Sequence, residues 1–160
     1  MSVSGRTAPL NTPIRSIAAG FDGSPDAAGA VRWAFALAAQ VGADVAVVHA
    51  IGLLEHAVDG GVDSQLEEAV RELVTQSSID PARVQFCPVD GDPCSALVRA
   101  GQPPAGADLL VVGSRGRGAH SGLLGSTSLE LAEHSDVPVV IVPSGRLGAT
   151  ALDGYRSVDR

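Results

Sequence analysis

Residues 111–128 read VVGSRGRGAHSGLLGSTS, and this stretch carries the pattern that decides the fold. It opens on apolar residues typical of the end of a buried strand and continues through five glycines. It ends at Gly125-Ser126, a pair typical of the start of a helix. The stretch therefore predicts a strand, a glycine-rich loop and a helix in direct succession.

The rest of the chain repeats this alternation of apolar runs and helical patterns. The expected strands cover residues 16–21, 43–50, 83–89, 108–113 and 138–143. Helices are expected at 25–41, around the apolar stripe at 66–74, at 94–100 and at 125–135. Ser24 is the expected N-cap of the first helix, and Gly42 is expected at its end. A loop is expected at 56–64. This order predicts an α/β fold, a single Rossmann-like doubly wound domain with a five-stranded parallel sheet and helices on both faces.

The length and composition limit the organisation of the chain. Its 160 residues suffice for one domain, which we expect at 14–143, with mobile tails at 1–13 and 144–160. Aromatic residues make up only 3% of the chain, so a core of Val, Leu, Ile and Ala is expected.

The charge and the remaining composition argue against several classes of partner. A net charge of −7 argues against nucleic acid and against an anionic membrane surface. No apolar run approaches the length of about 20 residues that spans a bilayer, and the first residues lack the apolar segment of a secretory signal. The two cysteines, Cys87 and Cys94, fit neither a disulfide framework nor a zinc site. A cytoplasmic protein is therefore expected.

The glycine-rich loop has the features of a phosphate site. Glycines let a ligand approach backbone N–H groups, and a helix start adds N–H groups at the positive end of its dipole. Gly113 and Gly116 lie at the expected strand exit, and Gly125-Ser126 lies at the helix start. The pattern is neither GxxxxGK[ST] nor GxGxxG. The alternative is a tight turn with no ligand.

Three charged residues near these loops have alternative interpretations. Arg115 and Arg117 could offset phosphate charge, or they could be solvated surface residues. Asp22 follows the first expected strand and could accept a hydrogen bond within its own turn. Because Ser24 is the expected cap of the next helix, we expect Asp22 to face the crevice instead.

Four segments together resemble the universal stress protein family. They are FDGSPDAAGAVRWAFALAAQVGADVAVVHA, ADLLVVGSRGRG, LLGSTS and VPVVIVP, and the resemblance covers residues 15–143. In the ATP-binding branch of that family the loop reads G-x2-G-x9-G-[ST]. Here eight residues, 117–124, separate Gly116 from Gly125, so the loop is one residue short.

The resemblance implies a strand order of 3-2-1-4-5 and a site for ATP with Mg²⁺. Gly113 and Gly116 would lie near the ribose and the α-phosphate, and Gly125-Ser126 near the terminal phosphates. The aliphatic side chains at the end of the second strand would pack against the adenine. The residues implied for the site are Asp22, Gly23, Ala50, Ile51, Gly113, Arg115, Gly116, Gly125, Ser126 and Thr127.

The position of the missing residue decides what the shorter loop does. A deletion at the loop tip would leave the phosphate-binding groups in place. A deletion at the helix start would rotate that helix by about 100°, because a turn holds 3.6 residues. The rotation could move Ser126 away from the phosphates.

These patterns leave three functions open. The first is a nucleotide-sensing regulator in the stress response that acts through a homodimer, joined at the edge strand Val139–Val142, and through a partner protein. The second is a protein-interaction module of the same fold that binds no nucleotide. The third is an enzyme, a slow ATPase or an adenylyl transferase, for which no catalytic motif is found.

Overall fold

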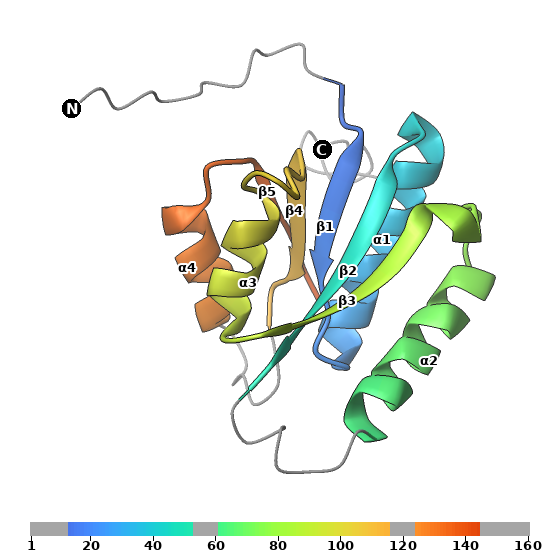
Figure 1. Ribbon diagram of the computed structural model, residues 1–160, viewed down its shortest axis with the longest axis horizontal. Coiled ribbons are helices and arrows are strands. Elements are labelled where there is room, and N and C mark those ends of the chain that lie inside the picture. Colours follow the sequence, from blue (N-terminus) through green and yellow to red (C-terminus); the bar gives the residue numbers. More distant parts are fainter. Residues whose placement is uncertain (1–12, 53–60, 116–123, 145–160) are drawn as a thin grey trace, which may run out of the picture.

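The computed structural model describes residues 13–52, 61–115 and 124–144. The expected tails fall outside this description apart from residues 13 and 144. Strands and helices alternate along the chain, as the sequence predicts (Figure 1). The elements are β1 (Ser16–Gly20), α1 (Pro25–Val41), β2 (Asp44–Ile51), α2 (Gly61–Thr75), a short 3₁₀ turn η2 (Pro81–Arg83), β3 (Val84–Asp90), α3 (Pro93–Ala100), β4 (Leu109–Gly113), α4 (Ser126–His134) and β5 (Val139–Val142).

The five strands form one parallel sheet in the order β3-β2-β1-β4-β5. Both the parallel sheet and the 3-2-1-4-5 order expected from the sequence are confirmed. The chain runs outward from β1 through β2 to β3, and then returns to the other side of β1 with β4 and β5. The strand order therefore reverses between β1 and β4, where ligands bind in folds of this type.

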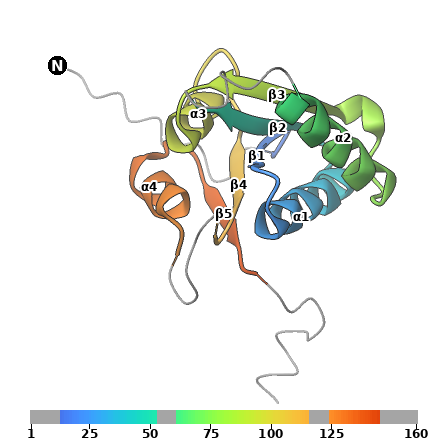
Figure 2. The ribbon, with the colours of Figure 1, turned by 90° about the horizontal axis from the view of Figure 1, so that it is seen from below.

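Helices cover both faces of the sheet, with α1 and α2 on one side and α3 and α4 on the other (Figure 2). Each face has its own apolar core. The larger core includes the fully buried Ile17, Val31 and Phe35 of β1 and α1. The smaller one contains Leu110 and Leu131 of β4 and α4. Aliphatic side chains dominate both cores, as the low aromatic content predicts.

Helix α1 has the ends that the sequence predicts. The Ser24 hydroxyl accepts a hydrogen bond from the Ala27 amide at 3.2 Å, and Pro25 is the first helical residue. The Gly42 amide donates to the Ala38 carbonyl at 2.8 Å and ends the helix.

Helix α2 begins earlier than the sequence pattern indicates. It starts at Gly61, so the expected loop at 56–64 is wrong for its last residues, and residues 53–60 lie outside the described part of the chain. The apolar stripe does not mark this first turn. Asp63 lies in it, where a carboxylate interacts favourably with the helix dipole.

The carboxyl end of β4 lies unusually close to the first turn of α1. A Cβ atom at Gly113 would lie 2.9 Å from the carbonyl carbon and oxygen of Asp26, and 3.2 Å from the amide nitrogen of Ala27. Real Cβ atoms do not approach backbone atoms this closely, so only glycine lets α1 start directly above β4.

We expect Gly113→Ala to lower the free energy of unfolding by about 1–3 kcal/mol, because the backbone of α1 must shift to admit the methyl group. The measurement is urea denaturation followed by circular dichroism. Gly29→Ala is the matched control, because its methyl group meets no atom within 4 Å and lies inside a helix. That change should stabilise the protein by about 0.5–1 kcal/mol. Equal effects of the two substitutions would contradict the close approach.

Candidate functional site

The base of the glycine-rich loop is closed by hydrogen bonds between β4 and α4. The Gly125 amide donates to the Ser114 carbonyl at 2.7 Å. Three residues later, the buried Ser128 hydroxyl donates to the Gly113 carbonyl, also at 2.7 Å. The chain therefore returns to the point where it left the sheet, and the first turn of α4 is fixed against the end of β4.

The start of α4 differs from the other helix starts in the described part of the chain. Each of the others has an acidic residue there: Asp26 in the first turn of α1, Asp63 in that of α2, and Asp92 as the N-cap of α3. The N-cap of α4 is Gly125, which makes no side-chain capping bond, and its first turn contains no acidic residue. The positive end of its dipole is therefore not offset by an adjacent carboxylate.

Asp22 and Gly23 form the turn between β1 and α1. The Ser24 amide donates to Asp22 Oδ1 at 2.9 Å, and Gly23 has a φ of +82°, which favours glycine. The Asp22 side chain therefore accepts a hydrogen bond within its own turn, which was one of the two sequence interpretations. The expectation that capping by Ser24 would keep Asp22 from this contact is wrong. Ser24 caps with its hydroxyl while its own amide still needs an acceptor. A carboxylate accepts several hydrogen bonds, so this contact is compatible with a ligand role.

The two expected adenine-lining residues lie at the end of β2 but on opposite faces of the sheet. Ala50 packs with the smaller core beside α3. Ile51 follows it in the strand and points to the other face. The Ile51 carbonyl accepts a hydrogen bond from the Gly91 amide at 3.2 Å. A flat base on one face of the sheet would therefore contact one of the two side chains.

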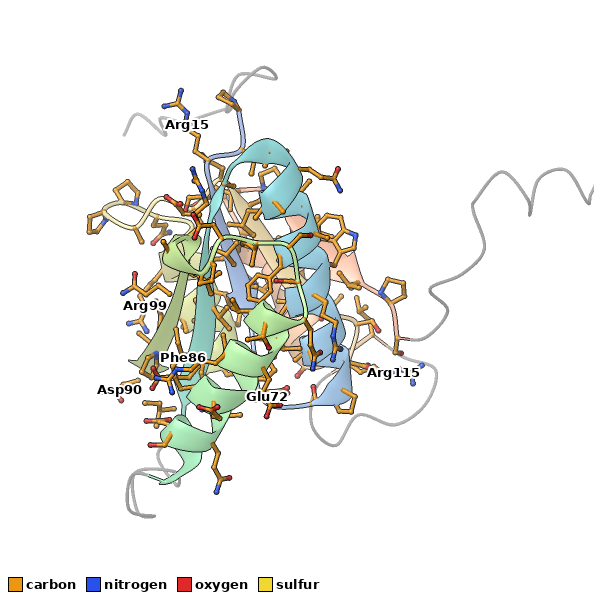
Figure 3. All side chains as sticks on the ribbon, turned by 90° about the vertical axis from the view of Figure 1, so that its right-hand side faces the viewer. Arg15, Glu72, Phe86, Asp90, Arg99 and Arg115 are labelled. Atoms are coloured by element: carbon orange, nitrogen blue, oxygen red, sulfur yellow. The ribbon has the colours of Figure 1, made fainter. Side chains whose placement is uncertain are left out.

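The remaining predicted residues lie around the loop. Arg115 lies at the carboxyl end of the sheet, at the opposite end of the molecule from Arg15 (Figure 3). The Ser126 side chain is exposed, and that of Thr127 is half-buried. Gly116 and Arg117 lie outside the described residues.

Two buried polar side chains were missed by reasoning from sequence. Ser128 anchors α4 to β4, and His49 of β2 places Nδ1 3.0 Å from the Phe21 carbonyl oxygen. Both are less than 5% exposed. A signal existed for His49, since it is the polar interruption in the apolar run of β2. Ser128 had no comparable signal, because serines and threonines are common in the first turn of a helix.

Comparison with family models matches residues 13–143 to the universal stress protein family. The match covers the whole sheet and all four helices of the described part of the chain. This chain belongs to the universal stress protein family.

Solved structures with the same fold include two universal stress proteins. One from Lactobacillus plantarum superposes with a TM-score of 0.71 at 18% identity, over 82% of this chain and 99% of that one. A universal stress protein in complex with cAMP gives 0.66 at 27% identity, over 82% and 98%. A protein from Mycobacterium tuberculosis H37Rv gives 0.55 at 27% identity, over 84% and 98%. Comparison with curated protein sequences gives no match.

The two free cysteines, Cys87 and Cys94, both have pKa values raised above the ordinary value of a thiol. Burial raises the pKa of Cys87. Burial, followed by the carboxylates of Glu130 and Asp92, raises the pKa of Cys94. A raised pKa lowers the thiolate fraction and with it the reactivity.

Neither a metal-binding cluster nor a membrane-spanning helix is found among the described residues. In residues 13–52, 61–115 and 124–144, no three His, Cys, Asp or Glu side chains are grouped to hold a metal ion. None of the helices in these ranges has the length and apolar character needed to cross a bilayer.

Replacing the anchor of α4 should destabilise this universal stress protein. We expect Ser128→Ala to lower the free energy of unfolding by about 1 kcal/mol, because it removes a buried hydrogen bond to the Gly113 carbonyl. Ser126→Ala, two residues earlier on the exposed side, is the control and should change it by less than about 0.5 kcal/mol. Urea denaturation compares the two. Equal losses would argue against the anchoring role of Ser128.

Proposed function

We propose that this universal stress protein binds an adenine nucleotide, ATP with Mg²⁺, at the carboxyl ends of β1 and β4, and acts as a nucleotide-sensing regulator. The observation that carries the proposal is the start of α4. This helix begins beside the exit of β4, where the Gly125 amide donates to the Ser114 carbonyl, and it has no acidic residue in its first turn and no capping side chain. An anionic group suits such a helix start.

The residues at this edge fit the parts of a nucleotide. The first turn of α4, at Gly125 and Ser126, would take the terminal phosphates, and Arg115 would add positive charge. Bound Mg²⁺ would offset charge between the phosphates. Asp22, at the end of the neighbouring central strand, would face the nucleotide, and the end of β2 would contact the base.

The hydrogen bonds at the loop base support a tip deletion as the origin of the shorter loop. The contacts of Gly125 with Ser114, and of Ser128 with Gly113, fix the rotation of α4 about its axis. With the helix start held at both points, we infer that the missing residue belongs to the loop tip rather than to the helix start. Ser126 then keeps its place beside the strand exit.

The relative solved with cAMP supports an adenine nucleotide and makes cAMP a second candidate ligand. The two ligands differ at the phosphates. ATP presents a chain of three that can reach the start of α4, while cAMP presents one that is tied to the ribose. We propose binding and signalling rather than turnover as the function, through a partner protein that responds to the bound state.

Calorimetric titration of nucleotide-free protein with Mg-ATP and, separately, with cAMP tests the proposal. We expect wild-type protein to bind Mg-ATP with micromolar affinity and Gly125→Asp to lose this binding. Gly125 has a φ of −65°, which every residue adopts, and Asp is a favoured N-cap. The substitution should therefore keep or raise stability while placing a negative charge where the phosphates would bind.

Gly29→Asp is the control, since it adds the same charge on α1, at a position where a Cβ meets no atom within 4 Å. It should bind ATP like the wild type. If the protein binds cAMP but not Mg-ATP, cAMP replaces ATP as the proposed ligand. Absence of both would contradict the nucleotide proposal and favour the protein-interaction module.

The edges of the sheet support a homodimer through β5. The β3 edge includes Pro88, which has no N–H to offer, and the Asp90 carbonyl of β3 accepts from Arg99 at 3.1 Å. The β5 edge, Val139–Val142, contains no proline and its four side chains are all partly exposed. Apolar strands with open edges pair with further strands, so we propose that a second copy pairs here.

Ile141→Pro tests the dimer. The carbonyl of Pro138 accepts a hydrogen bond from Leu110 of β4, and that of Val142 accepts one from Ser114 directly after β4. By alternation along the strand, the Ile141 amide therefore points outward. Proline removes that amide without removing a bond to β4. We expect a monomer for Ile141→Pro and a dimer for wild type and for Ile141→Ala, which keeps the amide. Light scattering after size exclusion measures the mass, and circular dichroism checks the fold. A monomeric wild type would contradict the dimer.

A further inference from the structure

His49 connects three elements at the end of the sheet that holds the candidate site. It is the sixth residue of β2 and only 4% exposed. Its Nδ1 lies 3.0 Å from the Phe21 carbonyl oxygen, directly after β1. Its ring stacks on Phe86 of β3, with centroids 6.5 Å apart. Its Nε2 lies 3.9 Å from Asp63 Oδ1, in the first turn of α2.

The contact with Phe21 determines which nitrogen carries the hydrogen. A carbonyl oxygen only accepts hydrogen bonds, so Nδ1 must be the donor in this contact. The other ring nitrogen, Nε2, is directed toward Asp63 and carries either a lone pair or a second hydrogen. At 3.9 Å the Asp63 carboxylate is beyond hydrogen-bond distance of Nε2, so the Phe21 carbonyl is the contact that places a hydrogen on Nδ1.

The acceptor carbonyl belongs to the peptide group that joins Phe21 to Asp22. The Phe21 amide is already held, since it donates to the Val48 carbonyl at 2.9 Å. With the His49 contact, the backbone amide and the backbone carbonyl of Phe21 are both hydrogen-bonded to residues of β2. The direction in which Asp22 leaves the sheet is therefore set by the imidazole as well as by the turn contact with Ser24.

We propose that His49 is a positioning residue of the nucleotide site: its Nδ1–H holds the Phe21–Asp22 peptide and thereby places Asp22 against the ligand. This inference rests on the proposed function for its ligand but has its own structural readout. Apolar packing alone would need no donor at this position. A Leu or Val would continue the pattern of β2 and would bury more apolar surface.

Two amide substitutions separate the two nitrogens of the ring. In His49→Asn the side-chain amide lies near the position of Nδ1 and keeps a donor for the Phe21 carbonyl. In His49→Gln it reaches the position of Nε2 and leaves that carbonyl without the donor. Both variants lose the stack on Phe86, so loss of packing is matched between them.

Two readouts are compared in the full-length variants and the wild type. The first is the position and hydrogen exchange of the Asp22 and Gly23 amide signals in nuclear magnetic resonance spectra. The second is the affinity for Mg-ATP and cAMP by calorimetry. We expect His49→Asn to keep wild-type Asp22 signals and an affinity within about threefold. The Gln variant should shift those signals and lose about tenfold in affinity, the loss expected for one hydrogen bond.

Long-range nitrogen–proton spectra of the wild-type ring should place the hydrogen on Nδ1. Equal losses in the two variants, or a ring that carries its hydrogen on Nε2 alone, would overturn the positioning role. If the wild type binds neither nucleotide, the proposed function fails. The Asp22 signals then decide the positioning role: a shift in the Gln variant alone supports it, and equal shifts overturn it.

Discussion

The structure depends on the crowded carboxyl end of β4. The backbone of α1 lies so close to Gly113 that no side chain fits there. The carbonyl of the same residue accepts the buried hydroxyl of Ser128, and the next carbonyl accepts the amide of Gly125. Two helices on opposite faces of the sheet therefore start beside one residue. The point where the strand order switches between β1 and β4 is therefore held by contacts of both α1 and α4 with the end of β4.

The charge of the chain explains why the helix starts differ. With a net charge of −7, the protein as a whole repels anions. Carboxylates near the starts of α1, α2 and α3 stabilise those helices by offsetting their dipoles. Such a residue at α4 would repel a phosphate. Its absence from the first turn costs the helix a small stabilisation, of about 0.3–1 kcal/mol, and leaves the positive end of the helix dipole without a carboxylate in that turn.

The fold followed from sequence because each of its signals is local. Apolar runs, the Ser24-Pro25 start and the Gly42 end predicted β1, α1 and β2 with little error, and alternation predicted the parallel sheet. The start of α2 was placed too late, because the apolar stripe that marks the helix does not reach the first turn, where Asp63 lies. The contacts of Gly113 with Asp26 were out of reach, because a close approach between distant backbones leaves no pattern in neighbouring residues.

The site was predictable in its location but less so in its contacts. The loop at β4 and the turn at Asp22 were found from glycine spacing and strand ends, yet glycine has several uses. Gly113 is required by packing whether or not a ligand binds, so its presence alone is weak support for nucleotide binding. Departures from local rules are more informative. A histidine within the apolar run of β2 and a helix start without a carboxylate both depart from the local pattern, and both lie at the edge of the sheet where we propose that the nucleotide binds.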